Sequence, residues 1–110
     1  MTVFELLQSL NELDEHERIE AKRATEVGKS LLETVCAFAN EPALGGGWIL
    51  LGAVRDDLSL FPSYSLEGIE QPDKLVSDLA TQCRNTFNVP VRVGITTESY
   101  EGKVAVRVFV

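Results

Sequence analysis

Histidine and cysteine are scarce in this sequence of 110 residues. It contains one histidine, His16, and two cysteines, Cys36 and Cys83. A lone histidine argues against a histidine-based triad and a multi-histidine metal centre, and the cysteines lack the paired spacing of a zinc site. Both cysteines fall on apolar faces of predicted helices, where we expect buried, reduced thiols. Carboxylates therefore remain as the candidates for chemistry.

Long apolar runs are also absent. No stretch of about eighteen apolar residues occurs, and no basic segment precedes an apolar one at the N-terminus. We therefore expect neither a membrane span nor a signal peptide, and a cytoplasmic location. The length and the 45% hydrophobic content suit a single domain over residues 1–110. Because the chain ends within an apolar strand pattern, we expect this domain to be the N-terminal part of a longer protein with further C-terminal domains.

Positive charge is in the minority. Ten Lys and Arg residues stand against 17 Asp and Glu residues, which gives a formal net charge of -7. This balance weighs against a broad nucleic-acid surface, because such binding depends on neutralising phosphates with Lys and Arg. Basic residues nevertheless gather in one segment after an acidic N-terminus. The candidates for phosphate contact are Arg18, Lys22, Arg23 and Lys29.

The N-terminal pattern predicts a helix followed by a strand. Apolar residues recur at helical spacing over residues 3–13, and Thr2 with Glu5 fits a capping box. Residues 17–23 alternate between apolar and charged, which is the period of a half-buried strand. We expect the charged side of this strand, which carries Glu20, to face solvent. A charged cleft is the alternative.

A second helix is joined to a central strand through glycines. Residues 31–40 have helical periodicity, Ser30 with Glu33 fits a capping box, and a proline soon follows. Residues 48–54 are almost unbroken apolar, which predicts a strand buried on both faces. A phosphate-binding loop requires a strand before its glycines and a helix after them. The order here is reversed, so we predict that the glycines at 45–47 form a tight turn.

The C-terminal half predicts one helix and a hairpin. Residues 58–65 contain a proline and suit an edge strand or an irregular segment. A helix begins at Pro72 and carries apolar residues at four-residue spacing as far as Phe87. Two alternating segments, 91–97 and 104–110, then flank a turn. Together these elements predict an α+β (mixed α/β) fold, with a single mixed sheet of four to five strands, about three packing helices and a C-terminal β-hairpin.

Four short motifs occur in a characteristic order. They are Glu15-x-x-x-x-Glu20-Ala-Lys22, then Ala37-Phe38-Ala39-Asn40, then Gly-Gly-Gly-Trp-Ile-Leu-Leu-Gly at 45–52, and then Asp56-Asp57. In this order they resemble the Schlafen/AlbA-type domain, formerly called the divergent AAA ATPase domain. The resemblance covers roughly residues 3–110, and the combination of Ala-Phe-Ala-Asn with Gly-Gly is its most specific part.

The resemblance implies a nucleic-acid partner and a candidate metal site. Bacterial domains of this kind are described as DNA-binding parts of transcriptional regulators. In animal Schlafen proteins the same core is an endoribonuclease for structured RNA, in which three carboxylates bind a divalent metal. Carried over to this chain, the catalytic and metal-binding residues would be Glu15, Glu20 and either Asp56 or Asp57, and the metal would be Mg²⁺ or Mn²⁺.

Three functional hypotheses follow. The first is a nucleic-acid (DNA)-binding domain of a bacterial transcriptional regulator. The second is a protein interaction or oligomerisation module, motivated by the acidic balance and by an apolar C-terminal strand whose unpaired edge could recruit a partner chain. The third is the metal-dependent endoribonuclease that the resemblance implies.

Overall fold

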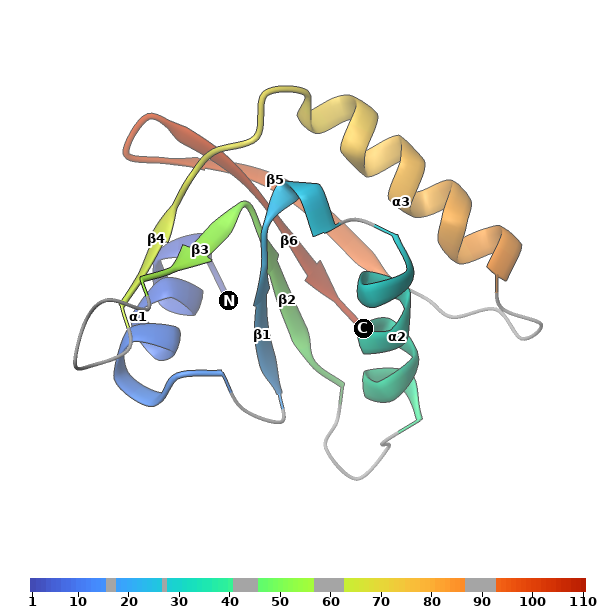
Figure 1. The fold of residues 1–110 in the computed structure, drawn as a ribbon, viewed down its shortest axis with the longest axis horizontal. Helices are drawn as coiled ribbons and strands as arrows, with labels where there is room; N and C mark the ends of the chain where they lie inside the picture. The colour runs from blue at the N-terminus through green and yellow to red at the C-terminus, as the bar shows by residue number, and fades with distance from the viewer. Residues whose placement is uncertain (16–17, 27, 41–45, 57–62, 87–92) are drawn as a thin grey trace.

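The computed structural model has the predicted α+β architecture (Figure 1). It describes residues 1–15, 18–26, 28–40, 46–56, 63–86 and 93–110; the predicted positions His16, Asp57 and Phe87 lie outside these ranges. Within the described part of the chain, no helix is long and apolar enough to cross a membrane. The elements are α1 (Val3–Leu13), β1 (Ile19–Lys22), the 3-10 helix η1 (Ala24–Glu26), α2 (Lys29–Ala39), β2 (Trp48–Leu51), β3 (Ala53–Arg55), β4 (Tyr64–Leu66), α3 (Pro72–Thr86), β5 (Gly94–Tyr100) and β6 (Lys103–Phe109).

The strands form a mixed four-stranded sheet and a separate pair. The order in the large sheet is β1-β2-β6-β5, with β1 parallel to β2 and with β6 antiparallel to both of its neighbours. Strands β3 and β4 form a two-stranded antiparallel sheet. The mixed sheet and the C-terminal hairpin are confirmed. The prediction that the C-terminal strand has an unpaired edge is wrong. Strand β6 pairs with both β2 and β5, and β5 lies at the edge of the sheet.

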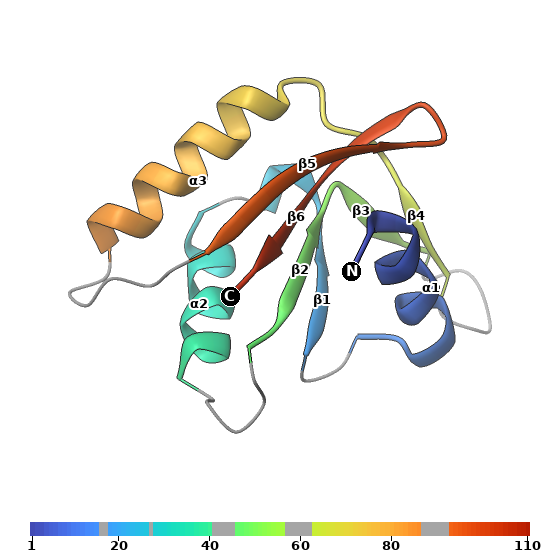
Figure 2. The same ribbon diagram turned by 180° about the vertical axis from the view of Figure 1, so that it is seen from behind.

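Each face of the four-stranded sheet carries its own core. Helices α2 and α3 pack on one face and α1 packs on the other, together with β3 and β4 (Figures 1 and 2). Strand β2 serves both cores, since Ile49 and Leu51 lie in the first and Leu50 lies in the second. All three side chains are fully buried, which confirms a central strand covered on both faces.

Only one of the two predicted capping boxes forms. The Thr2 hydroxyl accepts the Glu5 backbone N–H, and the Glu5 carboxylate accepts the Thr2 backbone N–H, so the box at α1 is confirmed. The box at Ser30 is wrong, because the N-cap of α2 is Gly28 and no side chain caps it. Instead, the Ser30 hydroxyl accepts a 2.8 Å hydrogen bond from the ammonium group of Lys22 on β1.

The predicted strand over residues 48–54 is broken at Gly52. This glycine has φ of +90°, and a Cβ atom there would lie 3.0 Å from Ile69 Cγ1. Both features favour glycine, since L-residues with side chains rarely adopt positive φ. The chain therefore turns at Gly52, leaves the large sheet, and forms β3 against β4.

The two cysteines differ in their surroundings. Cys83 is buried in the core under α3, and burial raises the pKa of its thiol. Cys36 is only half-buried, which corrects the expectation of full burial, and its sulfur accepts a 3.3 Å hydrogen bond from the Asn40 side chain. Both are free thiols, as predicted.

Candidate nucleic-acid interface

The charged side of β1 faces α2 and is largely covered. Residues alternate along a strand, so Ile19 and Ala21 pack toward α1 while Glu20 and Lys22 point toward α2. The Lys22 side chain is only 12% exposed, and its ammonium group lies 4.0 Å from a Glu20 carboxylate oxygen. The other Glu20 oxygen is buried and has no hydrogen-bond partner among the described residues. The expectation of a solvated face is therefore wrong, and the alternative, a charged cleft, is what the structure contains.

Two of the predicted basic residues, Lys22 and Arg23, point in different directions. Lys22 lies in the cleft against α2, whereas Arg18 is exposed where the chain enters β1. Arg23 points in a different direction, toward the acidic side chain of Glu67. Lys29 begins α2, and its side chain lies outside the described part of the structure. Lys22 and Arg23 are neighbours in sequence, but their side chains have partners on different elements, Ser30 on α2 and Glu67 after β4.

The predicted carboxylates that the structure describes make different contacts. A Glu15 carboxylate oxygen accepts the backbone N–H of Ala21 at 3.1 Å and so shields the outer edge of β1. Glu20 instead faces α2, and Asp56 follows β3, where its N–H donates to the Ser63 carbonyl at 2.8 Å. Among the residues that the structure describes, no three His, Cys, Asp or Glu side chains are arranged to hold a metal ion. Because Asp57 lies outside them, the metal set stays a prediction.

Asp14, the C-cap residue of α1, links the end of this helix to the two-stranded sheet of β3 and β4. The Tyr64 hydroxyl donates to Asp14, and the guanidinium group of Arg55 lies 3.0 Å from the other carboxylate oxygen of Asp14. The Tyr64 hydrogen bond lowers the pKa of the Asp14 carboxyl, while burial and Asp14 raise the pKa of Tyr64. The Asn11 side chain pairs with both backbone groups of Tyr64. These contacts are structural, since they join three elements and leave the Tyr64 hydroxyl occupied.

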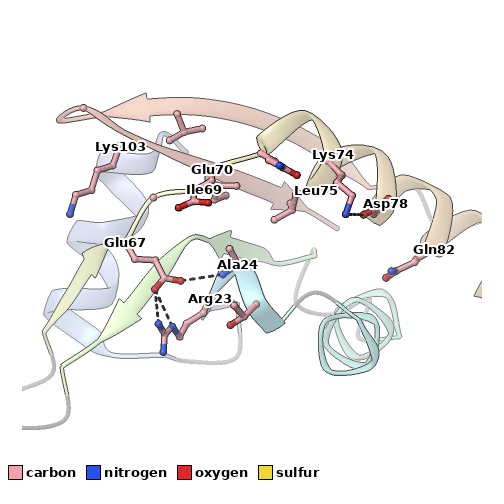
Figure 3. Close-up of a pocket in the computed structure, with 15 residues that line it drawn as sticks. Arg23, Ala24, Glu67, Ile69, Glu70, Lys74, Leu75, Asp78, Gln82 and Lys103 are labelled. Atoms are coloured by element: carbon pink, nitrogen blue, oxygen red, sulfur yellow. Dashed lines mark hydrogen bonds and ion pairs between the residues drawn. The ribbon is translucent and has the colours of Figure 1, made fainter.

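A groove lies between α3, η1 and the β5–β6 turn (Figure 3). It has a volume of about 790 Å³. Apolar side chains from Ile69 and Leu75 line part of it, and charged side chains surround them. Its three basic residues are Arg23, Lys74 and Lys103, and its three acidic residues are Glu67, Glu70 and Asp78.

Each basic side chain of the groove already has a partner. Arg23 binds Glu67 through two nitrogens, at 3.1 and 2.9 Å, and this contact lowers the pKa of Glu67. The Lys74 ammonium lies 3.9 Å from an Asp78 oxygen, and both side chains are exposed. The Lys103 ammonium donates to the Leu66 carbonyl at 2.9 Å. The Lys74–Asp78 pair holds its partners only weakly, because exposed pairs contribute at most about 1 kcal/mol.

Sequence reasoning found Arg23 but missed the other two cations. Lys74 lies in the first turn of α3, and Lys103 follows the hairpin turn, so the sequence separates them from Arg23 by 51 and 80 positions. Folding brings all three to one groove (Figure 3). No local pattern in the sequence signals this grouping.

Comparisons with known proteins agree with this fold. Residues 15–110 match the family described as Schlafen, AlbA_2, and the chain belongs to that family. The structure is also similar to the solution NMR structure of the N-terminal domain of a RecG-related protein from Nitrosomonas europaea, whose name relates it to ATP-dependent DNA helicases. The two share 44% identity at a TM-score of 0.90, and the match covers 99% of this chain and 72% of the other. No protein with a curated functional description matches the chain.

Proposed function

We propose that this chain is a nucleic-acid-binding domain, and more specifically the DNA-binding domain of a cytoplasmic bacterial transcriptional regulator. The observation that carries the proposal is the 44% identity, over 99% of the chain, to the N-terminal domain of a protein named for its relation to DNA helicases. Membership of the Schlafen, AlbA_2 family supports the same class of partner. Fold alone would be weak support, because one fold serves many functions.

The groove at α3 is the best candidate for the phosphate contact. Arg23, Lys74 and Lys103 come from three elements and surround one concave surface, so a backbone lying in it would meet three cations. Lys74 would leave its carboxylate partner at little cost, because that pair is exposed on both sides, whereas Arg23 would have to leave a more covered glutamate, Glu67, to bind a phosphate. The net charge of -7 limits the electrostatic attraction. We therefore expect moderate affinity with only two or three phosphate contacts. The logarithm of the binding constant should fall against the logarithm of the salt concentration with a slope of about -0.7 to -0.9 per contact.

Salt titration of binding tests this proposal. Labelled single-stranded and duplex DNA, and RNA, are titrated with the domain from 50 to 200 mM salt while fluorescence anisotropy is measured, which spans a range where phosphate contacts weaken strongly. The variant Lys74→Gln/Lys103→Gln should bind all sequences more weakly and with a shallower salt slope. Arg84→Gln is the matched control, because Arg84 is an exposed cation on the same helix that does not line the groove. Absence of any binding at 50 mM salt would remove the proposal.

A second candidate function, self-association, is favoured by the edge of β5. The hairpin turn closes on the pair Tyr100–Lys103. From this pair onward, the backbone N–H and C=O groups of every second β5 residue bond to β6. The N–H and C=O groups of the residues between them, Ile95, Thr97 and Ser99, point outward from the edge of the sheet. This edge carries neither a charge nor a proline at those three positions, and its register with β6 is unbroken. Natural edge strands are normally protected by charged side chains, prolines or β-bulges. The β5 strand of a second copy could pair antiparallel with this edge, with Thr97 opposite Thr97. In this register Glu98 would lie opposite Thr96 and not opposite another glutamate.

Sedimentation over a concentration series tests the second candidate. A dimer should form through the β5 edge, and Thr97→Pro should abolish it, because proline removes the central N–H donor and obstructs pairing. Far-UV circular dichroism checks that the variant remains folded, and Thr97→Val, which keeps the N–H, serves as the control. A strict monomer at all concentrations would contradict this candidate and leave the nucleic-acid proposal untouched.

A further inference from the structure

A row of side chains crosses the sheet at the end opposite the hairpin turn. The strand register places Ile19, Trp48, Phe109 and Gly94 side by side on β1, β2, β6 and β5. All four positions face the α1 side of the sheet, because Ile19 and Trp48 pack with the α1 core and Phe109 is two residues from Arg107, which contacts Met1 just ahead of α1. The two central strands of the sheet thus carry the two aromatic residues.

Helix α1 covers the β1 side of this row but does not extend over Phe109 on β6. It lies toward β3 and β4, away from the last residues of β6 (Figure 2). Phe109 is consequently 41% exposed, although Val108 next to it is fully buried. On the outer side of Phe109 stands Gly94, where an added Cβ would meet no atom closer than 3.9 Å. As far as the described residues go, a flat molecule could therefore approach the ring across β5.

The two rings pack against each other in a tilted arrangement. Their centroids are 4.8 Å apart and their planes are inclined by 44°. Arg107 occupies the next row of the same face, where its guanidinium group contacts the Met1 carbonyl at 3.0 Å and a Glu98 oxygen at 3.1 Å. An aromatic pair beside a guanidinium is suited to a planar, electron-rich ligand with a neighbouring negative charge. The neighbouring acid, Glu98, already pairs with Arg107.

We propose that Trp48 and Phe109 form a stacking platform for the unpaired bases of single-stranded nucleic acid, with Arg107 beside the adjoining phosphate. Aromatic residues on the central strands of an open four-stranded sheet stack two or three bases in known single-strand readers. Duplex bases cannot reach such a surface, since their faces are already stacked. The inference rests on the proposed function for the class of ligand. It does not rest on the groove at α3, which lies at the other end of β6 and can be altered separately.

The intrinsic fluorescence of the protein reports on this site directly. Trp48 is the only tryptophan in the chain, so a base that stacks on it should quench the whole tryptophan signal. Unlabelled oligothymidylate and oligouridylate are titrated into the domain and compared with a duplex of the same length. We expect single strands to quench Trp48 and the duplex to leave its emission nearly unchanged. The salt slope of this binding should be small, about -0.7 for each phosphate contact.

Two phenylalanine variants locate the contact. Phe109→Ala should weaken single-strand binding by at least about five-fold, the loss expected for one stacked base, and Phe109→Tyr should restore it because it keeps the ring. Phe4→Ala is the matched control: Phe4 is 50% exposed, and its ring packs against Tyr100 on a different part of the surface. The same oligonucleotides, labelled and followed by anisotropy, measure total binding independently of Trp48.

Each other outcome overturns a defined part of the inference. If anisotropy shows binding while Trp48 emission and the Phe109→Ala affinity are unchanged, the platform is wrong and the proposed function stands. If nothing binds at 50 mM salt, both fail. Equal quenching of Trp48 by the duplex would show that the site does not select single strands. An equal loss of affinity in Phe4→Ala would show that the contact is not located at Phe109. Quenching that depends on protein concentration without any oligonucleotide, and that Phe109→Ala abolishes, would show that a second copy of the chain covers the patch instead.

Discussion

The packing of α1 on the sheet allows a prediction about stability, because this helix lies outside the segment that matches the family. The family match begins at residue 15, whereas α1 spans Val3–Leu13. Leu10 is fully buried in the core between α1 and the sheet, together with Leu50. We expect α1 to be an integral part of this domain, so that truncating Leu10 destabilises the whole fold.

Truncation of Leu10 to alanine should lower the free energy of unfolding by about 2–5 kcal/mol, since buried Leu-to-Ala changes lose both transfer energy and packing. A domain of this size has a stability of about 5–15 kcal/mol, so the variant should remain folded with a Tm lower by roughly 10 °C or more. Leu13→Ala provides the control in the same helix. Its side chain is 67% exposed, and the change should stay within about 0.5 kcal/mol.

Urea unfolding followed by two probes measures the effect. Far-UV circular dichroism reports on all helices, and the emission of Trp48 reports on the core beneath α1, against which it packs. Coincident transitions would show that α1 unfolds together with the sheet. The reasoning would be refuted if Leu10→Ala cost less than about 1 kcal/mol, a loss too small for a buried leucine, or if Trp48 emission changed before the circular dichroism signal.

Two further predictions concern a close approach and a pH dependence. Gly47→Ala should destabilise the fold by about 1–3 kcal/mol in urea unfolding, because its Cβ would lie 2.6 Å from the Phe38 ring; Gly94→Ala, which meets nothing within 3.9 Å, should be nearly neutral. The pKa of Asp14 is lowered in the folded state by the Tyr64 hydrogen bond, so its contribution to stability is present above the unfolded pKa, about 3.9, and is lost as pH falls through the folded value. Urea midpoints measured from pH 6 down to pH 2 should therefore fall less steeply for Tyr64→Phe, and identical slopes would contradict this assignment.

Local signals in the sequence were sufficient for the elements whose contacts are local. The capping box at α1 joins Thr2 to Glu5, and the hairpin closes over the two residues after Tyr100, with Glu101 and Gly102 both at positive φ. These arrangements depend on residues within one turn of each other, so spacing alone predicts them. The charged side of β1 was also correctly identified as a feature, although its covering by α2 was not.

Tertiary contacts decided the rest, because they join residues that are distant in sequence. The central strand ends at Gly52, where the Ile69 side chain packs against the backbone. The Ser30 hydroxyl accepts a hydrogen bond from Lys22 and does not cap its own helix. The groove at α3 takes its cations from η1, α3 and the hairpin, and the aromatic row exists only because Trp48 pairs with Phe109 across 61 positions of the chain. Periodicity within a single segment carries no information on which strands become neighbours, since strand order depends on how all the apolar faces are buried together.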